Sequence, residues 1–210
     1  PEAIEMLARR FGVPVPEGRV EPGPDRRERA EMLALMEAAA QHLTRTLWTA
    51  AGTLAREYLL GRGFRKETLE RIRAGAARDA WDDLLGALRG KFPPALLAKA
   101  GLVLERQGKE GHYDRFRNRL TFAIRDTAGR IVSFGGRSLD NEEPKYLNGP
   151  ETPVYDKGRT LFRFHEVEKE IRTTGRAIVV EGYFDAVSLA SAGVPGVVAV
   201  CGTALGAGQV

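Results

Sequence analysis

The feature that most constrains the fold is the octet at residues 178–185, in which a short apolar run ends on Glu181, turns at Gly182 and reaches Asp185. An uninterrupted apolar run of this kind is typical of a buried strand in a parallel sheet. Active sites of open α/β sheets lie at the carboxyl ends of their strands. The octet therefore predicts a strand–turn–helix unit that brings two carboxylates to such an edge.

The two acids admit two interpretations. Carboxylate oxygens are hard ligands of the kind that Mg²⁺ prefers, and this cation often keeps waters and substrate phosphates in its shell. Glu181 can equally be the last residue of a strand, and Asp185 can lie in the first turn of a helix, where the helix dipole favours acids. The octet alone supports a metal site and a purely structural role about equally.

Composition sets the broad class. The chain has 210 residues, 43% hydrophobic and 29% charged, a balance typical of a globular protein with one or two compact units. No apolar run is long enough for a transmembrane helix, and no secretory signal opens the chain. The single cysteine, Cys201, lies in an apolar run, which favours a buried reduced thiol and a cytoplasmic location. The sequence holds no Cys/His cluster and so encodes no zinc site.

Helical periodicity dominates residues 25–101, after a Pro- and Gly-rich linker at 1–24 that can include a short helix at 2–10. Asp25 suits the cap of a first long helix. Core packing explains its apolar stripe far better than cofactor binding does. The stripe consists of Met32, Met36, Ala39, Leu43 and Leu47. Further helices are expected at residues 54–60, 66–74, 80–88 and 94–100.

Strand spacing replaces helical spacing in the second half of the chain. Alternation over residues 120–124 and an apolar run at 131–134 predict an antiparallel hairpin closed by a tight turn at 126–129. Gly135 and Gly136 are expected to break or bulge the returning strand. We expect a loop-rich segment at residues 138–160 and a helix at 164–172. One βαβ unit should follow, with a strand at 177–180, a helix at 185–192 and a strand at 197–200.

A row of arginines is the main charged feature. The segment from Arg115 to Arg137 holds six arginines and one acid, whereas the whole chain has a net charge of only +4. Arg115, Arg117 and Arg119 share one face if the segment is extended, and Phe116 then points to the other. Such a row suits phosphate contact, but for a bare row a solvated strand face is the somewhat better explanation. Arg137 follows the glycine pair, where the backbone can approach a ligand closely.

Two loop motifs add basic and aromatic groups. Lys145 and Tyr146 lie on a proline-bounded loop that continues to Asn148, and they offer a point charge and a stacking group suited to a nucleotide. Packing of the loop explains Tyr146 equally well. Lys157 and Arg159 flank a glycine, and an ordinary exposed loop explains them equally well.

Taken in order, these motifs resemble the catalytic core of bacterial DnaG-type primases. The segments that carry the resemblance are residues 113–126, 129–137, 144–148, 150–152, 157–159 and, as the opening of a Toprim domain, 178–185. The implied fold is α/β (α+β): a helical N-terminal subdomain with a small antiparallel sheet, followed by the first βαβ part of a Toprim domain. The implied boundaries are a linker at 1–24, a primase-core subdomain at 25–165 (helical 25–101, basic sheet 102–165) and a partial Toprim domain at 166–210.

The resemblance also implies an activity: a DNA-directed RNA polymerase that synthesises short RNA primers on single-stranded DNA during replication. Its substrates would be the template and ribonucleoside triphosphates, and its cofactor Mg²⁺ or Mn²⁺ held by Glu181 and Asp185. The implied catalytic residues are Glu181, Asp185, Lys145 and Tyr146. The implied nucleic-acid-binding residues are Arg115, Arg117, Arg119, Arg137, Asn148, Lys157 and Arg159.

The sequence departs from this family in one respect. The family's second acidic pair, an Asp-x-Asp on a later strand, is missing, so we expect a fragment with an incomplete metal site that is inactive alone. The family's zinc-binding domain and its helicase-binding segment are not visible either. The resemblance places the parent protein at bacterial replication forks in the cytoplasm, with no membrane partner. The alternative is a nucleic-acid-binding module of another Toprim protein, a topoisomerase or a nuclease, which the segment at 113–159 argues against.

Overall fold

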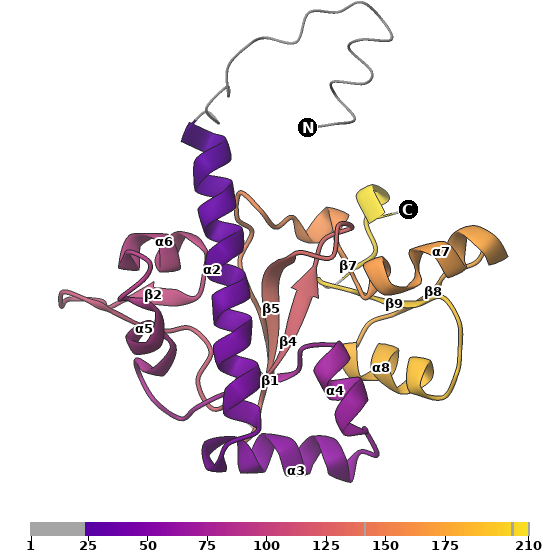
Figure 1. Cartoon of the computed structure of the whole chain (residues 1–210), viewed down its shortest axis with the longest axis horizontal. Helices are drawn as coiled ribbons and strands as arrows, with labels where there is room; N and C mark the ends of the chain where they lie inside the picture. Colours follow the sequence, from indigo (N-terminus) through magenta and orange to yellow (C-terminus); the bar gives the residue numbers. More distant parts are fainter. Residues whose placement is uncertain (1–23, 141, 203, 210) are drawn as a thin grey trace, which may run out of the picture.

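The computed structural model describes residues 24–140, 142–202 and 204–209. The predicted helix at 2–10 and the linker around it lie outside these residues. Within them, helices alternate with three small sheets, and Figure 1 shows the long helix α2 (Pro24–Leu47) against the strands at the centre of the molecule. The mixed α/β fold class is confirmed.

The long helix buries the stripe that its periodicity predicted. The stripe residues Met32, Met36, Ala39, Leu43 and Leu47 are all buried. Asp25, predicted as a cap, instead lies in the first turn, because the helix already includes Pro24. Proline is favoured at a helix start since it has no N–H to satisfy there. The helix contacts β1 and β5, so it covers one face of the central sheet.

Shorter helices follow as predicted, with different ends. They are α3 (Thr53–Gly61), α4 (Lys66–Arg71), α5 (Asp83–Leu88) and α6 (Pro94–Lys99), and a 3₁₀ turn, η1 (Ala50–Gly52), precedes α3. The helix predicted at 66–74 ends at Arg71, since Arg73 has φ +53°, outside the helical region, and Gly75–Ala77 then forms strand β1. This strand was not predicted, since three small residues carry no strand signal. A Cβ at Gly75 would lie 2.8 Å from the Cβ of Leu43, so only glycine lets the strand pass this close to α2.

The central sheet is antiparallel, in the order β1-β4-β5-β6. Its other strands are β4 (Arg119–Arg125), β5 (Ile131–Ser138) and β6 (Tyr146–Asn148). The predicted turn at 126–129 is confirmed, since the Gly129 N–H donates to the carbonyl of Asp126 at 2.9 Å. Gly129 has φ +79°, a left-handed conformation that glycine adopts without steric cost.

The prediction that Gly135 and Gly136 break the returning strand was wrong, because β5 runs through both in register with β4. Their missing side chains instead make room on opposite faces of the sheet. A Cβ at Gly135 would lie 2.2 Å from the Tyr183 ring, and one at Gly136 would lie 2.8 Å from the Phe116 ring. The two glycines are therefore a packing requirement of a sheet that is covered on both sides.

The condition under which the three arginines would share one strand face, an extended segment, is not met. Strand β3 (His112–Asp114) pairs with β2 (Val103–Glu105) in a separate hairpin, and β4 begins only at Arg119. Residues 115–118 between them form a loop. Asn118 has φ +46°, a left-handed conformation that asparagine tolerates better than most residues, and there the chain passes from one sheet to the other.

The C-terminal segment forms the predicted βαβ unit. It contains β7 (Leu161–Phe162), α7 (Phe164–Thr174), β8 (Ile178–Val180), α8 (Tyr183–Ser191) and β9 (Val197–Val200), with 3₁₀ turns η2 (Lys157–Arg159) and η3 (Ala207–Gln209). The strand order is β7-β9-β8, and β8 and β9 are parallel. Strand β8 was predicted to be buried, but it lies at the edge, with Ile178 and Val179 41% and 40% exposed. The apolar run identified this strand but not its place in the sheet.

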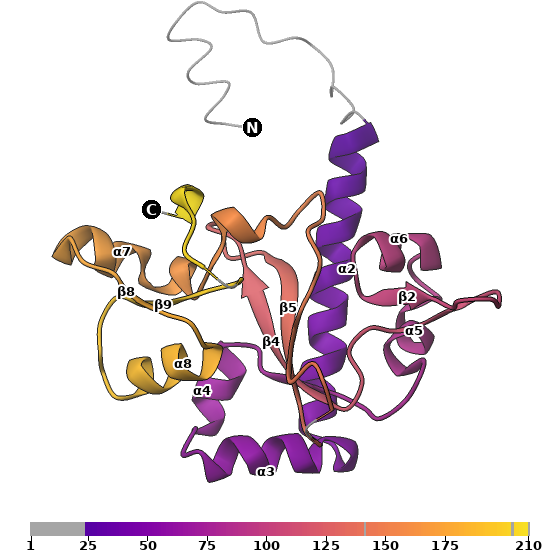
Figure 2. The same cartoon turned by 180° about the vertical axis from the view of Figure 1, so that it is seen from behind.

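The sheet joins the two halves of the molecule through its core. Figures 1 and 2 show α2, α5 and α6 on one side of β4 and β5, and α7 and α8 on the other. On the second side the Phe122 ring meets the rings of Phe162, Tyr183 and Phe184, with centroids 6.0, 5.7 and 5.0 Å away. This aromatic cluster fixes the βαβ unit against the arginine-bearing sheet.

Gly135 offers a test of this packing. We expect Gly135→Ala to lower the free energy of unfolding by about 1–3 kcal/mol, because the added methyl group overlaps the buried Tyr183 ring. Gly86→Ala is the matched control, since a Cβ there meets nothing within 4 Å inside α5. Helix propensity predicts that the control gains up to about 1 kcal/mol. Equal stabilities of the two variants in denaturant titrations would contradict the packing account.

Candidate nucleic-acid and metal site

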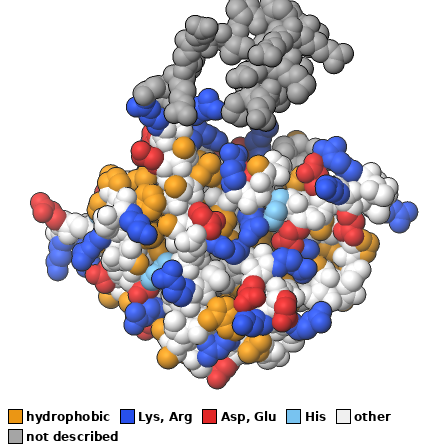
Figure 3. All heavy atoms as spheres, in the orientation of Figure 1, with side chains coloured by type: hydrophobic (Ala, Val, Ile, Leu, Met, Phe, Trp, Pro, Cys, Tyr) orange, Lys and Arg blue, Asp and Glu red, His pale blue; other side chains and the backbone are white. Residues whose placement is uncertain are grey.

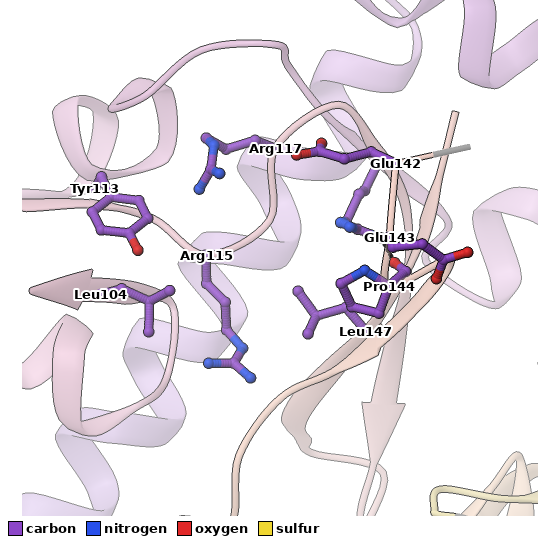
Figure 4. A pocket seen from close by; sticks show the side chains of 9 residues that line it. Leu104, Tyr113, Arg115, Arg117, Glu142, Glu143, Pro144 and Leu147 are labelled. Carbon is purple, nitrogen blue, oxygen red and sulfur yellow. Dashed lines mark hydrogen bonds between the residues drawn. The ribbon is translucent and has the colours of Figure 1, made fainter. Parts of the chain in front are cut away.

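The first candidate site is a pocket of about 240 Å³ beside the loop between β3 and β4 (Figure 4). It is lined by Leu104, Tyr113, Arg115, Arg117, Arg119, Glu142, Glu143, Pro144 and Leu147. Three of the predicted nucleic-acid-binding arginines therefore meet here, although they do not share a strand. We call this the arginine pocket.

Backbone carbonyls hold the three guanidinium groups in place. Arg119 donates to the Pro144 carbonyl at 2.7 Å, Arg115 to the Asn148 carbonyl at 3.3 Å, and Arg117 to the Asp114 carbonyl at 2.8 Å. Burial lowers the pKa of Arg115 and of Arg119. An arginine pKa starts so high that both groups keep their charge at neutral pH. The pocket thus presents three fixed positive charges, and no described hydrogen bond joins any of the three guanidinium groups to a carboxylate. Glu142 and Glu143 also line the pocket and offset part of this charge.

An aromatic pair borders the arginine pocket. Trp81 is 58% exposed, and its ring centroid lies 5.4 Å from that of Tyr113. The Arg117 guanidinium carbon lies 4.5 Å from the Trp81 centroid and 5.1 Å from the Tyr113 centroid. The Arg106 guanidinium carbon also lies over the Trp81 ring, 5.8 Å from its centroid. Such cation–π contacts orient the guanidinium groups and leave an indole that is still largely exposed. Trp81 was not predicted, because it lies far from the motif in the sequence, and its exposure is the signal that identifies it.

Asp114 fixes the position of this loop. Its buried carboxylate accepts the N–H groups of Leu84 at 2.7 Å and Leu85 at 2.9 Å, at the start of α5. Its own N–H donates to the Trp81 carbonyl at 2.7 Å. Burial raises the pKa of Asp114 to about 6, although the two N–H bonds act in the opposite direction. A single residue thus ties the arginine loop, Trp81 and α5 together.

The second candidate site is a cavity of about 710 Å³ at the carboxyl ends of β8 and β9. It is lined by Tyr146, Asn148, Lys157, Glu181, Gly182, Tyr183, Asp185, Val200, Cys201 and Gly202. Glu181 directly follows β8, and Asp185 lies in the first turn of α8, as the octet predicted. We call this the carboxylate cavity.

Strand β6 separates the two sites. Tyr146 and Asn148 line the carboxylate cavity, whereas Leu147 between them lines the arginine pocket. Successive side chains of a strand point to opposite faces, so this three-residue strand contributes to both sites at once. Asn148 also bonds across to the βαβ unit, with its amide N–H donating to the Cys201 carbonyl at 3.0 Å.

Comparison with known proteins gives the family. Residues 42–168 match the family described as DNA primase catalytic core, N-terminal domain, and residues 175–210 match the Toprim domain. The chain belongs to the DnaG-type DNA primase family. It is 41% identical over 207 residues to the DNA primase of Halalkalibacterium halodurans, covering 97% of this chain and 34% of that protein. It is 40% identical over 208 residues to the Pseudomonas putida primase, covering 97% of this chain and 32% of that protein. The chain thus spans about a third of the length of these relatives.

Solved primase structures share the fold. The RNA polymerase domain of Mycobacterium tuberculosis primase DnaG superposes with a TM-score of 0.81 at 37% identity, covering 86% of this chain and 59% of that one. A DnaG primase catalytic domain bound to single-stranded DNA gives 0.80 at 38% identity, with 87% and 57% covered. At these sequence identities, the similarity of fold agrees with membership of the same family.

The remaining predicted primase residues lie outside both sites. The guanidinium carbon of Arg137 lies 4.3 Å from the Tyr58 ring centroid, on the βαβ side of the sheet. Arg62, which was not predicted, lies over the same ring at 4.8 Å. Arg159 lines a separate cavity with Arg125, and Lys145 is exposed and lines neither site. The roles of these residues stay predictions.

The donor set of the carboxylate cavity fits a weak divalent-cation site. Glu181 and Asp185 supply hard oxygens, which suit Mg²⁺ or Mn²⁺. Among the described residues, no three His, Cys, Asp or Glu side chains gather closely enough to hold a metal. Two carboxylates must therefore share such an ion with water or substrate phosphates.

The titration of Asp114 gives a prediction about stability. Its pKa of about 6 lies above the ordinary value of 3.8, so the folded state holds this proton more tightly than the unfolded state does. The resulting stability is fully present below about pH 4 and is lost as the pH rises through 6. We expect the free energy of unfolding of the wild type, relative to Asp114→Asn, to fall by about 2–3 kcal/mol over that interval. Denaturant titrations at several pH values measure it, and parallel curves for the two proteins would refute it.

Proposed function

We propose that this chain is the part of a DNA primase that holds the single-stranded template beside the metal-binding carboxylates. In the reaction, the 3′-hydroxyl of a growing RNA primer attacks the α-phosphate of a ribonucleoside triphosphate. The observation that carries the proposal is the alternation of β6, which puts the arginine pocket and the carboxylate cavity on opposite sides of one strand. A template strand bound by the arginines is therefore separated from the carboxylate cavity, where the reaction takes place, only by β6.

Each site suits one part of this task. Arg115, Arg117 and Arg119 bind template phosphates, and the exposed Trp81 ring stacks on a base. Figure 3 shows basic and acidic side chains interspersed over one face of the molecule, so binding depends on the local pocket more than on a uniform positive surface. The structure of a related DnaG catalytic domain with bound single-stranded DNA supports this role.

In the carboxylate cavity, Lys157 and Tyr146 bind the triphosphate and the base of the incoming nucleotide. Glu181 and Asp185 hold Mg²⁺ or Mn²⁺, which when bound activates the attacking oxygen and stabilises the leaving one. Lys145, next to Tyr146 in the sequence, and Arg159, in a separate cavity, add positive charge outside the carboxylate cavity. Because the described acids number only two here, we expect this chain by itself to bind template without making primers.

The wider role follows from the family. We propose that the parent protein makes primers at bacterial replication forks in the cytoplasm and contacts the replicative helicase through a segment beyond this chain. A zinc site is expected only in a separate domain of that parent. None of the described helices is long and apolar enough to span a membrane.

Template binding is tested by Arg117→Ala. We expect a several-fold loss of affinity for single-stranded DNA and a salt slope that is flatter by about 1, because one phosphate contact is lost. Fluorescence anisotropy with labelled oligonucleotides at several salt concentrations measures both. Arg172→Ala on α7 is the matched control, because it removes the same charge from an exposed position far along the chain. Identical slopes for both variants would remove the arginine pocket from the proposal.

Metal binding is tested by Glu181→Gln. We expect Mn²⁺ affinity to fall by about tenfold or more, since even partners one shell removed from a metal commonly cost that much. Electron paramagnetic resonance of free Mn²⁺ during a titration gives the affinity without requiring catalysis. Glu168→Gln, an acid on α7 that pairs with Arg172, is the control and should bind as the wild type does. Unchanged binding by Glu181→Gln would reject this carboxylate as a ligand.

A further inference from the structure

Asn148 is bonded to both halves of the molecule. Its side-chain amide N–H donates to the Cys201 carbonyl at 3.0 Å, and its side-chain oxygen accepts the Tyr183 hydroxyl at 2.9 Å. Its main-chain carbonyl accepts the Arg115 guanidinium at 3.3 Å. The residue that sequence resemblance assigned to nucleic-acid binding therefore already uses both ends of its side chain within the protein.

These partners belong to the elements that build the carboxylate cavity. Cys201 directly follows β9, and Tyr183 opens α8, the helix that carries Asp185. Arg115 lies in the arginine pocket on the other side of the sheet. One asparagine thus links the start of α8 and the end of β9 to an arginine that lines the arginine pocket.

The surrounding packing leaves little freedom for this connection. Asn148 lies opposite Gly135 in the sheet, and a Cβ at Gly135 would lie 3.0 Å from the Asn148 side-chain oxygen and 2.2 Å from the Tyr183 ring. Tyr183 is itself buried and packs against Phe122 and Phe162. A buried hydroxyl that loses its partner carries a desolvation penalty, so the connection resists opening.

We propose that Asn148 is a positioning residue, a latch that fixes the carboxylate cavity relative to the arginine pocket, instead of a ligand for the nucleotide. The proposal rests on the proposed function, because the fixed spacing matters only if template and metal occupy the two sites. Positioning of this kind contributes to catalysis, since reacting groups must be held in a narrow range of geometry.

The reactivity of the Cys201 thiol shows whether the side-chain hydrogen bonds of Asn148 are formed. It is the only cysteine of the chain and is 0% exposed, and its carbonyl is the one that Asn148 holds. Burial raises the pKa of its thiol to about 11, so we expect slow modification by a water-soluble thiol reagent in the wild type. Opening of the latch would expose this thiol without unfolding the rest of the molecule.

The experiment compares thiol-labelling rates of the wild type, Asn148→Ala and Tyr183→Phe under native conditions. We expect Asn148→Ala to label roughly tenfold faster or more, because it removes both side-chain bonds of Asn148 and takes one hydrogen-bond partner from the buried Tyr183 hydroxyl. Tyr183→Phe removes one of the two side-chain bonds of Asn148, together with the contact of the hydroxyl with the Cys201 thiol, and its labelling rate should lie between the other two. Tyr183→Phe keeps the ring packing, so it decides the outcome if Asn148→Ala does not fold.

Leu97→Ala is the control for general destabilisation. Leu97 is buried in the core cluster on the α2 side of the sheet, apart from Cys201. In Leu97→Ala, the labelling rate of Cys201 should equal the rate expected from the measured global unfolding of that variant. In Asn148→Ala and Tyr183→Phe, the labelling rate should exceed the rate expected from their own global unfolding. Labelling that tracks global stability in all variants would overturn the latch.

The nucleotide-ligand role makes a different prediction. It requires Asn148→Ala to weaken nucleotide or DNA binding while leaving Cys201 fully protected, and that result would also overturn the latch. Failure of the wild type to bind single-stranded DNA would remove the proposed function instead, and it would leave the labelling comparison intact.

Discussion

The structure depends on a sheet whose two central strands are buried on both faces. α2 covers one face of β4 and β5, and the aromatic cluster around Phe122 covers the other. A sheet enclosed in this way has no open face on which to display charge, so charged side chains reach solvent at its edges and in its loops. Both candidate sites accordingly lie beside β6 and around the loop before β4.

The same burial explains how the sites differ in rigidity and charge. In the arginine pocket, backbone carbonyls and aromatic rings fix the guanidinium groups, which keep their charge despite partial desolvation. In the carboxylate cavity, Glu181 and Asp185 line an open space and stay accessible. Guanidinium groups that are fixed in position suit a nucleic-acid strand that must be held in one position along its length. Accessible carboxylates can share a metal ion with water and substrate.

Sequence reasoning succeeded where the signal was local. The helical stripe of α2, the turn at Gly129 and the order of the βαβ unit all follow from the spacing of side chains along one element. It failed where neighbours in space decided the result. Strand β1 exists because small residues fit against α2, and Gly135 continues a strand because the Tyr183 ring fills the space that a side chain there would need.

The sequence by itself determined the family, the helices and the longer strands, and the placing of Glu181 after a strand with Asp185 in the helix that follows. Only the tertiary structure decided which arginines share a pocket, that Trp81 joins them, and that Asn148 bonds within the protein. The physical reason is that periodicity fixes the direction of a side chain within its own element. Its partners depend on how distant elements pack, and packing across a sheet buried on both faces is set by the whole core.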